Sequence, residues 1–463
     1  MVNQNYLIYM TAGALVLSFL GACTKKINTI DKPAKPVMAT MQDTSTAGMQ
    51  IAAAATFTYT VKTSEWMVDG TNIPAGGTIY IPAGRRGSLL LKNLKGTSAA
   101  PIIVINQGGK VTFSTDVTAS YGFKTQNCRY FKVLGNGTPG IQYGFEVNGG
   151  NIGMTMDDLS SDFEIAYVDV HNSGFAGIMA KTDPSCDPAT WRGHFTMRNV
   201  NIHHNHVHQT GGEGLYIGNS FYAEGVSISC GTVLPHDVVN ARVWRNVTDS
   251  TGAEGIQVGS ATSGCVVWGN SVNHPGVSPF SAYQDNGIQI GEGTGGQCYN
   301  NVIKNAPGNG IIVLGLGDNM VYNNYIINSK SYGIFADSRY TPGPYFRFIN
   351  NTIIGSVLGG IKLNSETVPM NTVINNVIIQ PTGVPTIITK SSDVKLTSLN
   401  NYFGKDVSEC QFINYNADNF HLKSSSPLID KGADITLYGI PADYYGKARV
   451  AFGRVDIGAT EYQ

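Results

Sequence analysis

The sequence predicts an all-β protein built as a solenoid of stacked turns, and three observations carry this prediction. A Gly followed by Ile or Leu, one further residue and a second apolar residue recurs down the chain, and Gly287, Gly310 and Gly333 follow one another at 23-residue intervals. An Asn stands nine residues before the Gly in five of the repeats. Apolar residues alternate with period two around each motif, which indicates strands, and nothing in the repeat has helical spacing.

The two markers keep one offset along the middle of the chain. The motifs begin at Gly177, Gly214, Gly255, Gly287, Gly310, Gly333 and Gly360, and the preceding Asn residues are Asn205, Asn246, Asn301, Asn324 and Asn351. Asn270 fills the same role before a longer insertion. An Asn at a fixed bend can stack on its copy in the next turn and hydrogen-bond backbone that no sheet satisfies. Stacked turns lie about 4.8 Å apart and bury a continuous apolar column. The pattern resembles a right-handed parallel β-helix with about 22–23 residues per turn and about ten or more turns, since leucine-rich and hexapeptide repeats have other frames.

Composition excludes several other classes of protein. Charged residues make up 14% of the 463 residues, against roughly 25% in an average soluble domain. The 31 Lys and Arg against 32 Asp and Glu give a net charge of -1. No basic excess exists to neutralise a phosphate backbone, so we expect no nucleic-acid partner.

The first residues are expected to be a targeting signal and not part of the fold. An apolar stretch over residues 7–20 is followed by Leu20-Gly21-Ala22-Cys23, which resembles the bacterial lipoprotein signal. The resemblance implies that residues 1–22 are removed and that Cys23 is lipidated, although residues 1–10 contain no Lys or Arg. Residues 23–55 are then a flexible tether. We expect a monomeric outer-membrane lipoprotein that faces the periplasm or the cell surface and touches the membrane only through its anchor.

Two further segments complete the expected organisation, a β-helix over 56–415 and a capping segment over 416–463. The capping segment contains Ser426-Pro427-Leu428-Ile429-Asp430 and Asp456-Ile457-Gly458-Ala459-Thr460. It resembles the closing segment of exported bacterial β-helix proteins, especially those of the Bacteroidetes group. A solenoid needs a polar cap over its open end. Besides Cys23, six Cys without a Cys-x-x-Cys pair are expected to be buried free thiols.

Taken together, residues 56–463 resemble the pectate-lyase-like β-helix superfamily. That superfamily contains polysaccharide lyases, glycoside hydrolases, uronate epimerases and non-enzymatic adhesins, so the resemblance specifies a fold without an activity. The paired Asp and the Gly-His-Gly signature of polygalacturonases are missing, and so is the Asp-Pro-His motif of alginate epimerases.

The middle turns are the expected binding region. In the Gly-Ile-x-Ile motif the Ile side chains point inward, so x points outward. The middle turns place Tyr216, Gln257 and Gln289 at x, with Gly two residues further on, and this combination predicts an open cleft for a long ligand. Loop insertions near 183–193, 220–238 and 274–284 fall on the same turns, and one of them brings Arg192 toward the substrate.

Acidic residues directly precede these strands. Glu213, Glu254 and Asp285 would lie about 5 Å apart if they occupied adjacent turns. Carboxylates at that distance persist if a cation binds between them or if one is protonated. We therefore expect these three residues to be catalytic or to bind a metal, and the resemblance implies calcium. Two of them could instead be the acid and base of a glycosidase, or Glu213 and Glu254 could be turn residues bonded to backbone.

His208 and Lys181 are expected to assist the acids. His206 and His208 are predicted to point outward near Glu213, but alternation and the Asn bend scatter the histidines of segment 203–208 over different faces, so no zinc site is expected. A column of outward aromatic residues could stack on sugar rings or pack beneath another part of the chain. Its members are His203, Trp244, Trp268, Tyr299 and Tyr322.

These observations predict an exported carbohydrate-active protein, a polysaccharide lyase that cleaves an acidic, uronate-containing polysaccharide. Elimination from a uronate needs a neutralised carboxylate, a base for the C5 proton and an acid for the leaving oxygen. Two alternatives stay open. One is a glycoside hydrolase that uses a carboxylate pair, and the other is a non-catalytic carbohydrate-binding or surface scaffold protein.

Overall fold

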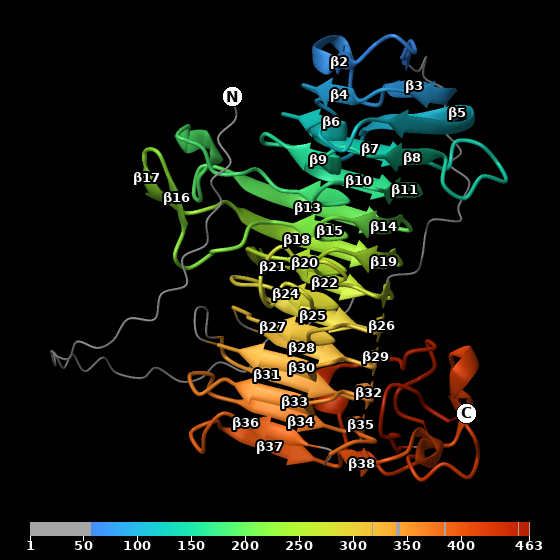
Figure 1. Cartoon of the computed structure of the whole chain (residues 1–463), viewed down its shortest axis with the longest axis vertical. Coiled ribbons are helices and arrows are strands. Elements are labelled where there is room, and N and C mark those ends of the chain that lie inside the picture. The colour runs from blue at the N-terminus through green and yellow to red at the C-terminus, as the bar shows by residue number, and fades with distance from the viewer. Residues whose placement is uncertain (1–56, 317, 339–342, 384–385, 452, 463) are drawn as a thin grey trace, which may run out of the picture. The chain divides into compact units, whose positions relative to one another are not determined.

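The motif strands form one parallel sheet, and the structure is a right-handed parallel β-helix (Figure 1). The computed structural model describes residues 57–462, with gaps at 317, 339–342, 384–385 and 452. The predicted signal segment, Cys23 and the tether lie outside the described residues. The sheet of motif strands has twelve members. They are β2 (Met67–Asp69), β4 (Leu89–Lys92), β6 (Tyr121–Gln126), β9 (Ile152–Asp157), β12 (Ile178–Ala180), β15 (Leu215–Ile217), β20 (Ile256–Val258), β24 (Ile288–Ile290), β27 (Ile311–Val313), β30 (Tyr332–Asp337), β33 (Gly359–Asn364) and β36 (Ile387–Thr389).

A second sheet of 24 strands contains two parallel ladders, one on each side of the Asn bend. The ladder before the bend contains β1 (Thr58–Thr60), β3 (Thr78–Arg86), β5 (Ile102–Ser114), β7 (Arg129–Leu134), β10 (Ser161–Ala166), β13 (Thr196–His203), β18 (Asp237–Trp244), β21 (Ala261–Ser263), β22 (Cys265–Trp268), β25 (Gly296–Tyr299), β28 (Asn319–Tyr322), β31 (Phe346–Ile349), β34 (Asn371–Ile374) and β37 (Leu396–Leu399). The ladder after the bend contains β8 (Phe145–Asn148), β11 (Val168–His171), β14 (His206–Thr210), β19 (Val247–Thr251), β23 (Ser271–Asn273), β26 (Val302–Lys304), β29 (Tyr325–Ile327), β32 (Thr352–Ile354), β35 (Val377–Ile379) and β38 (Tyr402–Gly404).

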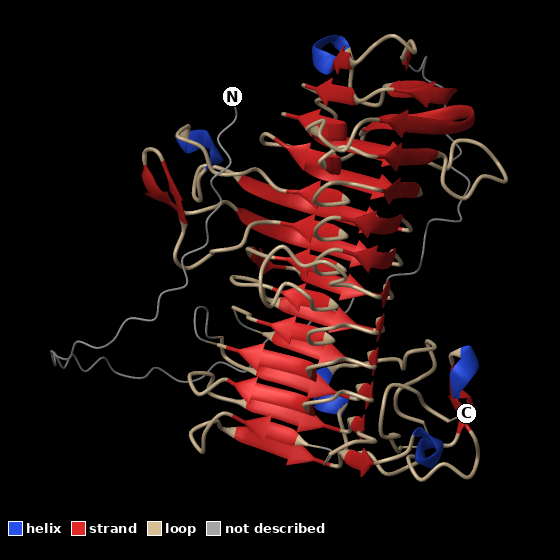
Figure 2. Ribbon diagram, in the orientation of Figure 1, coloured by secondary structure: helices blue, strands red, loops and turns tan. Residues whose placement is uncertain are grey.

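Secondary structure outside the stack is sparse (Figure 2). Two antiparallel hairpins are formed by β16 (Val226–Ile228) with β17 (Gly231–Val233), and by β39 (Phe412–Asn414) with β40 (Asn419–Leu422). Short 3₁₀ helices are η2 (Gly70–Asn72), η3 (Pro188–Thr190), η4 (Val407–Cys410), η5 (Tyr415–Ala417) and η6 (Thr436–Tyr438). Within the described residues there is no α-helix, and none of the helices is long and apolar enough to cross a membrane.

The predicted Asn marker forms a continuous ladder at the bend. The side chain of Asn270 donates to Asn301 Oδ1 at 3.0 Å and to the Val243 carbonyl at 3.0 Å, and the Asn270 backbone N–H also donates to Asn301 Oδ1. The same pattern runs through Asn205, Asn246, Asn270, Asn301, Asn324, Asn351, Asn376 and Asn401. Each amide satisfies backbone groups that the sharp bend removes from the sheet.

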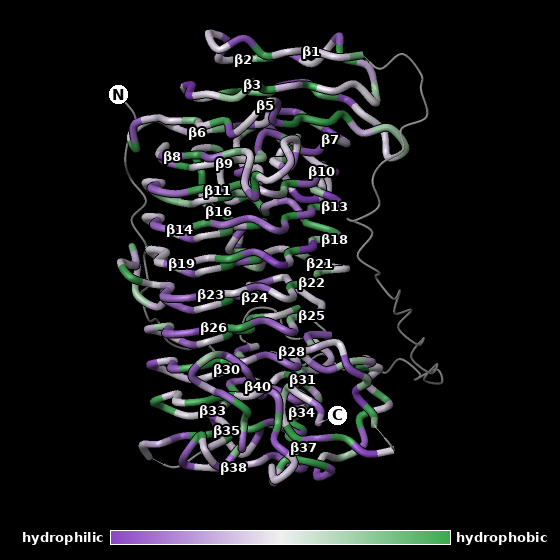
Figure 3. The backbone as a smooth tube through the Cα atoms, turned by 90° about the vertical axis from the view of Figure 1, so that its right-hand side faces the viewer, coloured by the Kyte–Doolittle hydropathy of each residue, from purple (hydrophilic) through white to green (hydrophobic). Residues whose placement is uncertain are grey.

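The inward positions of the motif strands build the core. Ile256 and Val258 of β20 are fully buried, as are Ile311 and Val313 of β27. The outward positions stack in register as predicted, with Tyr216 paired to Gln257 and Gln257 to Gln289. Hydrophobic and hydrophilic segments occur throughout the stacked turns in the tube coloured by hydropathy (Figure 3).

The segment that follows β38 packs along the side of the last turns. Its Phe412, Phe420 and Leu422 join Ile327 and Ile354 in one apolar cluster. A second cluster contains Met320, Tyr322, Ile349 and Ile374 of the stack together with Ile435, Ile440 and Val455 of the segment. The segment therefore covers outward apolar side chains of these turns.

Candidate functional site

Glu213 and Glu254 occupy equivalent positions on neighbouring turns, one residue before the Gly of each motif strand. Gly177 N–H donates to the Glu213 carbonyl and Gly214 N–H donates to the Glu254 carbonyl, both at 2.9 Å. The pairing of β15 with β20 sets the separation of the two turns near 4.8 Å. Glu213 is 2% exposed and Glu254 is 0% exposed, so the two predicted acids form a buried neighbouring pair.

Burial makes both side chains weak acids. It raises the pKa of Glu213 to about 7, against the lowering effect of its own backbone N–H and of Lys181. It raises the pKa of Glu254 to about 8, with further raising by the charges of Glu213 and Asp285 and lowering by a hydrogen bond from Asn286. Both values lie near neutral pH, where a carboxyl group can give or take a proton.

Two oxygen atoms of this pair, Glu213 Oε2 and Glu254 Oε2, are buried and have no hydrogen-bond partner. Gln257 Oε1, in the outward column, is also buried without a partner. Buried polar atoms in native proteins nearly always find a partner. A shared proton or a cation with a preference for oxygen would satisfy the two glutamate oxygens.

The prediction for Asp285 is wrong in register. Asn286, not Asp285, takes the position equivalent to Glu254, and its Nδ2 donates to Glu254 Oε1 at 3.0 Å. Asn309 continues the column by donating to Asn286 Oδ1 at 2.8 Å. Asp285 stands two residues before Gly287, whereas Glu213 and Glu254 each stand one residue before the Gly of their motif. Asp285 is half-buried, and burial raises the pKa of its carboxyl group.

Lys181 and Tyr216 flank the acid pair. The Lys181 ammonium lies 4.5 Å from the centroid of the Tyr216 ring and 2.8 Å from Asp183 Oδ1. Burial lowers the pKa of Lys181, but its interactions with Tyr216, Asp183 and Glu213 raise that pKa further, so the amine is charged. Burial also raises the pKa of Tyr216, which keeps its hydroxyl protonated. The structure therefore joins Lys181 to the predicted acids.

The open cleft expected from Tyr216, Gln257 and Gln289 is a wrong prediction. These side chains are 8%, 2% and 7% exposed, because the inserted loops lie over them. Ser220 Oγ contacts the Tyr216 hydroxyl at 3.1 Å and accepts from Gln257 Nε2 at 3.0 Å. The same loop places the Tyr222 ring against Gly293, where a Cβ would meet the ring at 2.2 Å. The loop containing Ser220 thus closes the site.

Arg192 holds loops together and is not free to bind substrate, contrary to its predicted role. Its Nη2 donates to the Tyr222 carbonyl at 2.6 Å, and its Nε donates to the Pro235 carbonyl at 3.2 Å. The guanidinium also lies 3.6 Å from the centroid of the Tyr222 ring. These contacts join the loop after β12 to the loop after β15.

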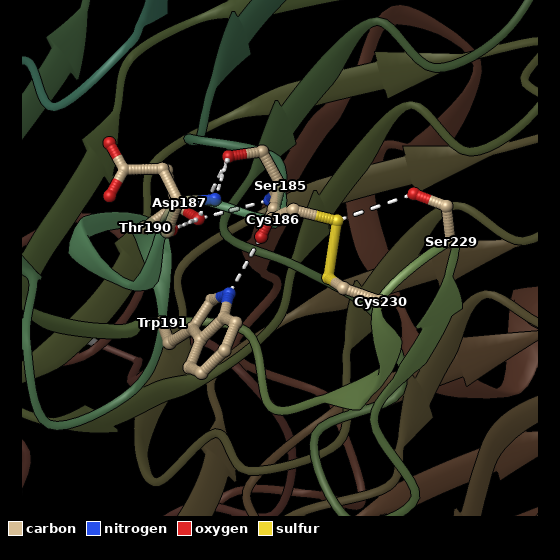
Figure 4. The surroundings of a disulfide bond; sticks show 7 residues. All are labelled: Ser185, Cys186, Asp187, Thr190, Trp191, Ser229 and Cys230. Atoms are coloured by element: carbon tan, nitrogen blue, oxygen red, sulfur yellow. Dashed lines mark hydrogen bonds between the residues drawn. A yellow bond between two sulfur atoms is a disulfide. The ribbon is translucent and has the colours of Figure 1, made fainter.

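A disulfide between Cys186 and Cys230 joins the same two loops, with 5.8 Å between the Cα atoms (Figure 4). The expectation of free thiols is wrong for this pair, whose partners are 44 residues apart in sequence. It is confirmed for the other four described cysteines, which are buried and free: Cys128, Cys265, Cys298 and Cys410.

His208 belongs to a different cluster, on the strands after the Asn bend. Its Nε2 lies 3.3 Å from Asp169 Oδ1, and its ring stacks on that of His171 at 4.9 Å. His206 Nδ1 lies 3.0 Å from the same Asp169 oxygen. Sequence reasoning missed Asp169, although His-x-His on one strand was a usable signal. The prediction that the histidines scatter over different faces is wrong for His206 and His208, which flank the inward Val207.

The predicted aromatic column exists in register, but its rings face one another. Trp244 has His203 on one side at 4.0 Å and Trp268 on the other at 4.8 Å, with interplanar angles of 21° and 6°. Tyr299 and Tyr322 continue the stack at 4.6 Å. Because sugar stacking needs a free ring face, this column stabilises the solenoid and offers only ring edges.

Comparisons with known proteins find the same β-helix architecture. Residues 237–403 match the family model described as right handed beta helix region. No sequence match to a curated protein is found. Among solved structures, the pectate lyase Pel9A is 17% identical with a TM-score of 0.44, covering 84% of this chain and 89% of that chain.

Two other solved structures are similar to the chain. The GH136 lacto-N-biosidase from Eubacterium ramulus is 13% identical with a TM-score of 0.48, covering 72% of this chain and 63% of that chain. An alginate lyase from Paenibacillus sp. is 15% identical with a TM-score of 0.36, covering 75% and 96%. At such identities the likeness concerns the fold alone. The pairing of the strands and the family model together identify the chain as a right-handed parallel β-helix.

Proposed function

We propose that this protein is an exported, lipid-anchored polysaccharide lyase that cleaves an acidic, uronate-containing polymer. One observation carries the proposal. Two neighbouring glutamates, Glu213 and Glu254, have pKa values raised to about 7 and about 8, and Glu213 interacts with the charged Lys181. A cation, a base near neutrality and a protonated phenol are the groups that elimination from a uronate requires.

Each group has a defined task in this proposal. The Lys181 ammonium binds the uronate carboxylate and stabilises the charge that develops there. Glu213, with a pKa of about 7, takes the proton from C5. The C4–O bond breaks as the C4=C5 double bond forms, and the Tyr216 hydroxyl donates its proton to the leaving oxygen. Glu254 interacts electrostatically with Glu213 and tunes its charge.

Access to Glu213 requires movement of the covering loop. The contacts of Ser220 with Tyr216 and Gln257 are two hydrogen bonds, each contributing about 1 kcal/mol. The disulfide holds the middle of this loop through Cys230, between β16 and β17, and Arg192 holds its two sides at Tyr222 and Pro235. We therefore place substrate access at the start of the loop, around Ser220.

Calcium fits the donor set of the acid pair as an alternative to the arrangement in which Glu213 is the base. Glu213 and Glu254 would hold it through their unpaired Oε2 atoms, which are the hard oxygen ligands that calcium prefers. When bound, the ion supplies positive charge that neutralises a uronate carboxylate. Asp285 lies outside this column and is not part of the proposed ligand set.

Export and anchoring rest on separate support. The lipoprotein-like segment before Cys23 lies outside the described residues, but the Cys186–Cys230 disulfide is typical of proteins that leave the reducing cytoplasm.

A glycoside hydrolase is the second candidate, because two carboxyl groups on adjacent turns, one half-protonated at neutral pH, also match an acid and nucleophile pair. One assay separates the candidates. The purified protein is incubated with uronate polymers and with neutral glycans, and absorbance of unsaturated uronate and reducing ends are both recorded. The lyase gives both signals, and Lys181→Ala removes them. Reducing ends without absorbance indicate the hydrolase. Binding without either product indicates a carbohydrate-binding scaffold.

A further inference from the structure

We propose that Asp169, His206 and His208 form a binding site for a divalent transition metal of the zinc class, separate from the acid pair. The site lies on β11 and β14, on the ladder after the Asn bend. The parallel register pairs Asp169 with His206, and His208 follows two residues later on the same face. Strand periodicity therefore places the three side chains together.

The ligand atoms have the spacing of a coordination shell. Asp169 Oδ1 lies 3.0 Å from His206 Nδ1 and 3.3 Å from His208 Nε2, and all three atoms lie within 4.8 Å of one another. In a tetrahedral zinc site with bonds of about 2.0–2.2 Å, neighbouring ligand atoms are about 3.3 Å apart. A single ion can contact all three atoms after small side-chain rotations.

Both rings converge on one carboxylate oxygen. Asp169 Oδ1 is buried and has no well-aligned donor, although two ring nitrogens lie within 3.3 Å of it. The side chains of His206 and His208 remain partly exposed. An ion would satisfy the oxygen and keep an open position for water, as three-ligand zinc sites do.

Neighbouring residues support the ligands from outside the set. The His171 ring stacks on the His208 ring, and His171 Nε2 lies 3.3 Å from Glu146 Oε1. Such contacts fix the orientation of a ligating imidazole.

The chemistry of the donors selects the ion. Two imidazole nitrogens and one carboxylate oxygen favour zinc, nickel, cobalt or copper over calcium and magnesium, which prefer oxygen alone. Calcium at Glu213 and Glu254 and zinc at Asp169, His206 and His208 can therefore be tested separately. Neither result depends on the other.

The test uses the untagged, folded chain after removal of bound metal and chelator. Calorimetric titration with zinc should give one equivalent of binding with a micromolar or lower Kd, and cobalt should give a visible spectrum that excess calcium does not remove. His208→Ala and the shape-conserving Asp169→Asn should each weaken zinc binding by about 10²-fold. His203→Ala, which alters a neighbouring histidine outside the set, should bind as the parent does.

Two results would overturn the site. One is the absence of saturable zinc and cobalt binding by the parent chain. The other is parental binding by both Asp169→Asn and His208→Ala. Circular dichroism of each variant checks that the solenoid is intact, and the cobalt spectrum of the parent remains informative if one variant fails to fold.

Discussion

At the scale of single residues, Glu254 is the test of the proposed reaction centre. It lies between Glu213 and Asn286 in the column, so its charge acts on the proposed base. Glu254→Gln keeps the shape and removes the ionisable group. We expect a loss of activity of about 10²-fold on an identified polymer. Lys362→Ala, which changes the outward column of Tyr216, Gln257 and Gln289 several turns away, should leave the rate nearly unchanged. Parental activity in Glu254→Gln would exclude the acid pair from the reaction.

The same pair predicts how stability depends on pH. Burial raises the pKa of Glu213 from 4.5 to about 7 and that of Glu254 to about 8, so the folded chain holds these protons more tightly than the unfolded chain. The contribution of these two glutamates to the free energy of unfolding is then largest below pH 4.5, and it falls as the pH rises toward 8. One pKa unit corresponds to about 1.4 kcal/mol, which gives about 3 kcal/mol for Glu213.

Denaturant unfolding at pH 5 and pH 8 in the presence of a chelator measures this fall. The Glu213→Gln, Glu254→Gln double variant should lose less stability than the parent between the two values. Added calcium should restore stability to the parent at pH 8, because a cation favours the ionised carboxylates. Identical pH dependence in parent and double variant would contradict the assignment.

Sequence reasoning predicted that Glu213 and Glu254 are neighbours, but it did not predict the loops that surround the candidate site. It placed Glu213 and Glu254 correctly because the Gly-Ile motif fixes the register of each turn. It misplaced Asp285 by one position, because it grouped Asp285 with the other acids although Asn286 is the residue directly before Gly287. It could not foresee that Ser220 and Tyr222 would cover the outward side chains, since the path of a loop has no periodicity to read.

Among the structural elements, the Asn ladder has the most regular hydrogen-bond pattern. Asn301 donates to Asn324 Oδ1 and to the Val267 carbonyl, and its Oδ1 accepts from Asn270. Asn301→Ala leaves several of these groups unpaired and buried, which should lower the free energy of unfolding by roughly 2 to 4 kcal/mol.

Thermal unfolding followed by circular dichroism checks the ladder prediction. Asn414→Ala is the matched control, because Asn414 is exposed and its side chain makes no capping hydrogen bond. A Tm for Asn301→Ala equal to that of the control would show that the ladder contributes little. The sequence predicted this element well, since each Asn repeats the environment of the one before.

For the whole molecule, the repeats in the sequence predicted the β-helix, but they did not predict how the inserted loops are joined. Every turn from Gly177 to Gly360 carries the same motif, so each turn gives an independent prediction of the strand register. A wrong prediction at one turn is therefore detected by comparison with its neighbours. The disulfide between Cys186 and Cys230 joins two loops that are not part of the repeat. The repeat pattern therefore could not predict this pair.

Anchoring is a property of the whole chain and has its own prediction. Cys23→Ser removes the residue that the lipoprotein-like segment offers for lipid attachment, so the protein should move from the membrane fraction to the soluble fraction. Fractionation of cells that express parent and variant, followed by immunoblotting, measures the shift. A variant that stays with the membrane to the same extent as the parent would rule out anchoring through Cys23.

The returning C-terminal segment has a consequence for the order of events in folding. Asn350 Nδ2 donates to the Asp456 carbonyl at a sequence separation of 106, and Asn323 Nδ2 donates to the Ala442 carbonyl at a separation of 119. A chain that emerges N-terminus first completes these turns before their covering residues exist. Apolar side chains such as Ile327 and Ile354 then face water until the last residues arrive, which makes this interval the one most exposed to aggregation.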